Sequence, residues 1–117
     1  MPVDLDRDAF ERLVDRALDD IPDELARLVH NVVFLVEDEP PDDEPDILGL
    51  YYGVALTERT SDYGLVLPDR IFVFRRPLME MCDDLDDLTE EVRITVVHEI
   101  AHHFGIDDDQ LHALGYG

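Results

Sequence analysis

The chain has 117 residues, of which 45% are hydrophobic, so its composition is that of one globular domain and not of a disordered polymer. Its 30 acidic residues outnumber nine basic ones, all arginine, and give a formal net charge of −21. Because nucleic acids and anionic lipid surfaces are bound through basic groups, this charge argues against either partner. Cys82 is the single cysteine, and no leader or membrane-spanning pattern is present, so we expect one cytoplasmic domain over residues 1–117.

The N-terminal third of the chain predicts two helices and a strand. From Phe10 onward, apolar residues recur at spacings of three and four, which is typical of an amphipathic helix over residues 6–21. Pro22 ends this helix, and a second short helix is expected over residues 23–30. Residues 32–36 are all apolar and predict a buried strand.

An acidic segment follows over residues 37–46, where seven of the ten residues are acids and three are prolines. Such a composition supports neither a packed core nor a helix, so we expect a solvated, mobile connection. Apolar runs predict two further strands at residues 49–56 and 70–75, with a turn at residues 61–64 between them. A short helix is expected to begin at Pro77.

The most strongly specified element is a helix in the C-terminal third. Asp87 and Glu90 fit a capping box at its start, and apolar residues on most of its faces predict that it runs through the core. Gly105 follows as the residue that ends the helix in the left-handed conformation. A last short helix is expected over residues 108–114.

A metal-binding motif lies inside this helix, His98-Glu99-Ile100-Ala101-His102. Residues four apart project from one helical face, so both imidazoles can reach one zinc ion. Glu99 lies about 100° around the helix, where it can reach a metal-bound water without binding the metal. Three residues after His102 comes Gly105, and three later Asp108, an oxygen ligand that completes the pattern HExxHxxGxxD. Three protein ligands with an open fourth position are typical of catalytic zinc.

Several neighbouring residues compete for roles at this site. Asp107 and Asp109 are alternative third ligands, although Asp107 with Gln110 also fits a capping box for the last helix. His103 is expected to pack or to be solvated. The alternative is that it contacts a metal ligand or the substrate. The candidates for contacting substrate or an oxyanion are chosen by their nearness in sequence alone: His103, His112, Tyr116 and Arg93.

Four segments carry a resemblance to a known family: NVVFLVEDEP, GLYYGVALTER, LPDRIFVFRRPL and HEIAHHFGIDD, with LGYG at the end. Together they resemble the minimal zincin-like metallopeptidase family of bacteria over residues 10–117. The resemblance implies a compact α+β zincin-like fold, with a small mixed sheet of three to four strands beside the active-site helix, a helical N-terminus and a short C-terminal helix. It also implies that His98, His102 and Asp108 match the metal ligands and Glu99 the catalytic position.

These observations predict a peptidase with one zinc ion and Glu99 as general base. The strand at residues 70–75 is expected to be the edge along which an extended peptide pairs, and the acidic charge favours basic peptides as substrates. The alternative is a non-catalytic protein that zinc stabilises and whose acidic surface engages a basic partner. A toxin-like or processing enzyme that depends on a partner is a third possibility. No pattern indicates the oligomeric state.

Overall fold

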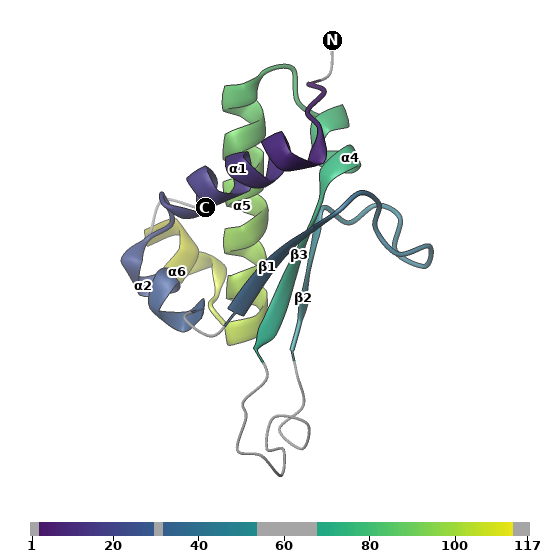
Figure 1. The fold of residues 1–117 in the computed structure, drawn as a ribbon. Helices are drawn as coiled ribbons and strands as arrows, with labels where there is room; N and C mark the ends of the chain where they lie inside the picture. Colours follow the sequence, from purple (N-terminus) through teal and green to yellow (C-terminus); the bar gives the residue numbers. More distant parts are fainter. Residues whose placement is uncertain (1–2, 30–31, 54–67, 114–117) are drawn as a thin grey trace.

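The computed structural model describes residues 3–29, 32–53 and 68–113 (Figure 1). Helices cover one face of a small sheet, and α5 is the longest element. In chain order, the elements are α1 (Arg7–Leu18), α2 (Asp23–Ala26), a 3-10 turn η1 (Arg27–Val29), β1 (Val32–Glu37), β2 (Gly49–Tyr52), β3 (Asp69–Phe74), α4 (Arg75–Glu80), α5 (Leu85–Phe104) and α6 (Asp108–Ala113).

The three strands form a mixed sheet in the order β1-β3-β2. β1 runs parallel to β3, with Phe34 opposite Ile71, and β2 runs antiparallel to β3, with Tyr51 opposite the same Ile71. The predicted α+β class and the small mixed sheet are therefore confirmed. The strand expected at residues 70–75 is the central strand of this sheet and not an edge, because β1 and β2 pair with its two sides.

The core lies between the sheet and the helices. α5 packs against β2 and β3, and α1 packs against α5, as Figure 1 shows. The inner face of the sheet contributes Ile71 and Val73, which are fully buried. The fully buried apolar side chains of the helices come mainly from α1 and α5: Phe10, Ala17, Leu25, Leu78, Leu88, Val92, Val96, Val97 and Ile100.

Most element boundaries lie near the predicted ones, and the differences have local causes. α1 ends at Leu18, although Ile21 beyond it is still buried. The helix expected from Pro77 begins at Arg75, because the first turn of a helix tolerates proline, whose missing N–H has no partner there. The described part of β2 ends at Tyr52, and both the rest of the predicted strand and the turn at residues 61–64 lie outside the described residues.

The cap of α5 differs from the predicted one. Asp84, not Asp87, is the N-cap residue, and its Oδ1 accepts the N–H of Asp87 at 2.8 Å. The earlier start adds Leu85, Asp86 and Asp87 to the helix, ahead of the fully buried Leu88. Gly105 ends the helix with φ of 70°, as predicted. Within the described ranges, no helix has the length and apolar character needed to span a membrane.

The acidic segment is anchored at its beginning, which the sequence did not indicate. Arg75 Nε donates to Asp38 Oδ1 at 2.9 Å, and Arg76 Nη1 donates to Glu39 Oε1 at 3.2 Å. The hydrogen bond and charge of Arg75 lower the pKa of Asp38 below its ordinary value of 3.8, although partial desolvation opposes this effect. The segment therefore begins as an extension of β1 that is tied to α4, and its side chains are otherwise largely exposed.

Candidate metal and catalytic site

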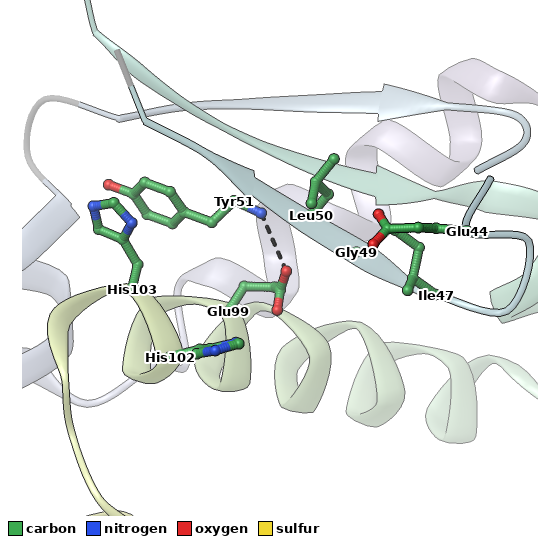
Figure 2. A pocket seen from close by; sticks show the side chains of 8 residues that line it. All are labelled: Glu44, Ile47, Gly49, Leu50, Tyr51, Glu99, His102 and His103. Carbon is green, nitrogen blue, oxygen red and sulfur yellow. Dashed lines mark hydrogen bonds between the residues drawn. The ribbon is translucent and has the colours of Figure 1, made fainter. Parts of the chain in front are cut away.

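The C-terminal half of α5 carries the motif at the border between core and solvent. Ile100 and Ala101 are buried, whereas His98 and His102 are exposed and lie one turn apart on the helix. Glu99 is half-buried and faces β2 (Figure 2). The helix thus divides the motif, with two imidazoles open to solvent and one carboxylate held under the sheet edge.

The Glu99 carboxylate is fixed by a backbone donor. The Tyr51 N–H, on β2, donates to Glu99 Oε1 at 3.1 Å (Figure 2). Burial raises the pKa of Glu99 above its ordinary value of 4.5, and the negative charge of Glu44 adds to this increase. The Tyr51 N–H and the charges of His102 and His98 oppose it. A carboxyl group whose pKa is raised toward neutrality is suited to accept a proton and to return it.

Gly49 allows β2 to approach α5 this closely. A Cβ at Gly49 would lie 2.7 Å from Thr95 Cγ2 and 3.1 Å from the carbonyl oxygen of Phe72. No side chain fits between the strand and the helix at this point. The missing side chain therefore keeps the Tyr51 N–H, two residues further along β2, within hydrogen-bonding distance of Glu99.

Tyr51 also joins the end of α5 to the central strand. Its ring stacks on His103 with centroids 3.8 Å apart and an interplanar angle of 10°, and its hydroxyl donates to Asp69 Oδ2 at 2.7 Å. Asp69 is buried at the start of β3, with the same oxygen 3.9 Å from His103 Nε2. Phe104 packs edge-on against both rings. His103 is thus in contact with two aromatic rings, and its predicted contact with substrate stays a prediction.

A pocket of about 480 Å³ opens between β2 and α5. Figure 2 shows His103 and Tyr51 at one end, Glu44 and Ile47 at the other, and Glu99 with His102 between them. Eight residues line it: Glu44, Ile47, Gly49, Leu50, Tyr51, Glu99, His102 and His103. Of these, only Glu99, His102 and His103 were predicted as site residues. Gly49 at the start of a predicted strand was an available signal, because a glycine in a strand often marks a close approach of another element.

The other predicted residues lie elsewhere or outside the description. Asp107 caps α6, since its Oδ1 accepts the Gln110 N–H at 2.8 Å and Gln110 Oε1 accepts the Asp107 N–H at 3.0 Å, which confirms the predicted capping box. His112 is exposed on α6, and Arg93 donates to Glu90 on α5; neither lines the pocket. Tyr116 lies outside the described residues.

The whole ligand set of His98, His102 and Asp108 stays a prediction. Asp108 is the first residue of α6, and its side chain is outside the described part of the structure. Among the side chains that the structure does describe, no three His, Cys, Asp or Glu groups converge as a metal site. The two accessible imidazoles one turn apart nevertheless fit the donor chemistry of zinc, which accepts imidazole nitrogen and carboxylate oxygen.

Comparison with known proteins agrees with this geometry. A model of the zincin-like metallopeptidase family matches residues 29–117, which include β1 to α6 and the whole HExxH motif. The chain belongs to this family. It is also similar to a solved structure, a conserved hypothetical protein from Thermus thermophilus, at 25% identity and a TM-score of 0.57, with 84% of this chain and 92% of that chain covered. No curated protein matches the chain significantly.

Proposed function

We propose that this protein is a zinc-dependent peptidase in which Glu99 is the general base. The observation that carries the proposal is the half-buried Glu99 carboxylate, which the Tyr51 N–H holds at 3.1 Å beside two exposed imidazoles one helical turn apart. Membership of the zincin-like metallopeptidase family supports the same chemistry. His98, His102 and Asp108 would hold the metal, and bound zinc supplies a Lewis acid for the peptide carbonyl.

Glu99 carries the proton in the proposed reaction. It takes a proton from the water whose oxygen bonds to the carbonyl carbon, and it gives that proton to the amide nitrogen as the C–N bond breaks. The raised pKa of Glu99 favours the first transfer, and the Tyr51 N–H keeps the carboxylate oriented for both.

The proposed path for the peptide runs along β2. This strand replaces the one at residues 70–75, because β3 has partners on both sides, whereas β2 is paired only with β3 among the described strands. Gly49 to Tyr51 also line the pocket that holds Glu99. An extended peptide that adds to β2 would therefore lie beside the catalytic carboxylate.

The substitution Glu99→Gln tests the mechanism. We expect the variant to retain zinc and its melting temperature while kcat/KM on a peptide library falls by about a hundredfold to ten-thousandfold, the usual contribution of a general base. Glu91→Gln, earlier on the same helix and away from the pocket, is the matched control and should keep wild-type activity. A Glu99→Gln enzyme that binds zinc and still cleaves at the wild-type rate contradicts the mechanism.

Removal of the metal separates this proposal from a zinc-stabilised binding protein. Chelation should abolish cleavage, and added zinc should restore it. If chelation instead lowers the melting temperature and no peptide in the library is cleaved by the zinc-loaded protein, the non-catalytic alternative is correct.

The identity of the third ligand can be tested by alanine substitution at each of the three adjacent aspartates. Asp108→Ala should reduce zinc bound per chain, measured after equilibrium dialysis. Asp107→Ala should retain zinc but lower stability by about 1 kcal/mol, the cost of a lost helix cap. Asp109→Ala should change neither quantity, and loss of zinc in that variant alone would move the ligand to Asp109.

A further inference from the structure

The pocket beside Glu99 contains a second carboxylate that comes from a distant segment of the chain. Glu44 belongs to the acidic segment, yet it lines the same pocket as Glu99 and His102. Figure 2 shows its side chain at the opposite end of the pocket from Tyr51 and His103. Two carboxylates and two imidazoles therefore share one opening, and none of the described residues that line it is an arginine. The chain contains no lysine.

Glu44 differs from the acids at the start of the same segment. Asp38 and Glu39 pair with Arg75 and Arg76, whereas Glu44 forms no ion pair with any described residue. Its backbone is held in a turn, because the Glu44 N–H donates to the carbonyl oxygen of Pro41 at 3.0 Å and Pro45 follows directly. The carboxylate is thus presented to the pocket from a restrained backbone position.

The residues near Glu44 give this end of the pocket both apolar surface and a carboxylate. Ile47 is partly buried and contributes apolar surface next to Glu44, as Figure 2 shows. The volume of about 480 Å³ lies within the range of about 300–1,000 Å³ that is usual for ligand pockets. A long apolar stem that ends in a positive charge is the side chain that matches an apolar wall followed by a carboxylate.

We propose that Glu44 determines substrate specificity by binding a lysine or arginine side chain of the peptide in this pocket. The aliphatic stem packs on Ile47, and the ammonium or guanidinium group pairs with the Glu44 carboxylate. This assignment rests on the proposed peptidase function, because that function makes the ligand a peptide. The acidic charge of the whole chain by itself predicts a general preference for basic peptides. Here that preference is attributed to one residue, Glu44, which can be substituted.

Paired peptides test the assignment. A scanning set places one lysine at each position of an otherwise uncharged peptide, and a twin set carries norleucine, which keeps the stem and lacks the charge. Affinity is measured by calorimetry with the zinc-loaded Glu99→Gln protein, and kcat/KM is measured with the wild type. At one position of the peptide we expect the affinity and kcat/KM of the lysine peptide to exceed those of its norleucine twin by about fivefold, as for a partly exposed ion pair.

The substitution Glu44→Gln should remove this preference, so that each lysine peptide binds no better than its norleucine twin. Asp43→Asn is the matched control, because it removes the same charge from the preceding exposed residue, which does not line the pocket. It should retain the lysine preference. Glu44→Arg should reverse the order, so that a peptide with glutamate at that position binds better than the lysine peptide. Added salt should weaken both preferences.

The outcomes separate this inference from the proposed function. If cleavage depends on Glu99 but Glu44→Gln preserves the lysine preference, or weakens lysine and norleucine peptides equally, the role of Glu44 is wrong and the peptidase stands. If Asp43→Asn loses the preference as fully as Glu44→Gln, overall charge is the cause and the inference is again wrong. If no peptide is cleaved, the peptidase proposal fails, and the affinities still decide whether Glu44 binds a cationic side chain.

Discussion

A single row of side chains along α5 changes character halfway along the helix. Its members follow at spacings of three and four, so they share one face: Leu88, Val92, Thr95, Glu99 and His102. In the first half, Leu88 and Val92 are fully buried in the core. In the second half, Glu99 and His102 line the pocket beneath β2. Thr95, buried against Gly49, lies at the transition.

The comparison shows how one helix serves both packing and chemistry. Apolar burial in the first half supplies stability, and the same face then meets a strand edge where a carboxylate has a backbone donor. Substitutions in the first half should therefore change the free energy of unfolding, whereas those in the second half should change activity. Three predictions test this division, beginning with the largest expected effect, and a fourth concerns the acidic segment.

Leu88→Ala tests the apolar half of the row. Removing a fully buried leucine side chain should lower the free energy of unfolding by about 3 kcal/mol and the melting temperature by about 10 °C. Leu85→Ala, at an exposed position on the same helix, should cost less than about 0.5 kcal/mol. Zinc content and cleavage at a temperature where the variant is folded should match the wild type. Loss of activity in the folded Leu88→Ala protein would show that the two halves are not separable.

Gly49→Ala tests the transition point. The added methyl group must displace either Thr95 or the backbone of β3, so we expect a loss of about 2 kcal/mol in stability, as for overpacked cores. The strand would move away from α5 and lengthen the hydrogen bond from Tyr51 to Glu99, so activity should also fall. Thr95→Ser removes the Cγ2 methyl group that lies 2.7 Å from the position that the alanine methyl group would take. In a double-mutant cycle it should recover part of both losses, and strict additivity would refute the proposed contact.

Tyr51→Phe tests the polar half through the hydroxyl group alone. The substitution removes a hydrogen bond to the buried Asp69 carboxylate but keeps the backbone N–H that holds Glu99. We expect a stability loss of about 1.5 kcal/mol, measured by denaturant unfolding. Tyr52→Phe on the exposed side of the same strand should be neutral within about 0.5 kcal/mol. Equal effects of the two substitutions would mean that the Asp69 contact contributes nothing.

Local signals explain which parts of the structure the sequence predicted. The reciprocal bonds between Asp107 and Gln110 and the left-handed Gly105 depend on residues within a few positions, and both were predicted. The same reasoning misplaced the cap of α5, because Asp83, Asp84, Asp86 and Asp87 offer several caps within one turn. In the structure Asp84 is the cap, and its Oδ1 accepts the Asp87 N–H.

Local sequence patterns could not predict which strands pair with one another, because the partners come from distant segments of the chain. The run at residues 70–75 has the composition of a strand, but its central position depends on β1 and β2, which come from separate segments. Glu44 and Tyr51 line the pocket together with α5 residues about 50 positions later in the chain. The sequence therefore predicted the motif helix and its HExxH residues, whereas the residues that surround Glu99 required the fold.

The smallest expected effect concerns the ion pair between Asp38 and Arg75, which anchors the start of the acidic segment far from α5. Because the folded-state pKa of Asp38 is lowered from its ordinary value of 3.8, its pairing with Arg75 stabilises the fold above that pH and is lost as the pH falls through the folded value. The stability difference between wild type and Asp38→Asn should therefore be constant from neutral pH to about 4 and disappear below 3.8. Asp43→Asn, which removes an exposed carboxylate of the same segment, is the matched control. A difference for Asp38→Asn that persists at the lowest pH at which the chain stays folded would show that this residue acts through its shape and not through its charge.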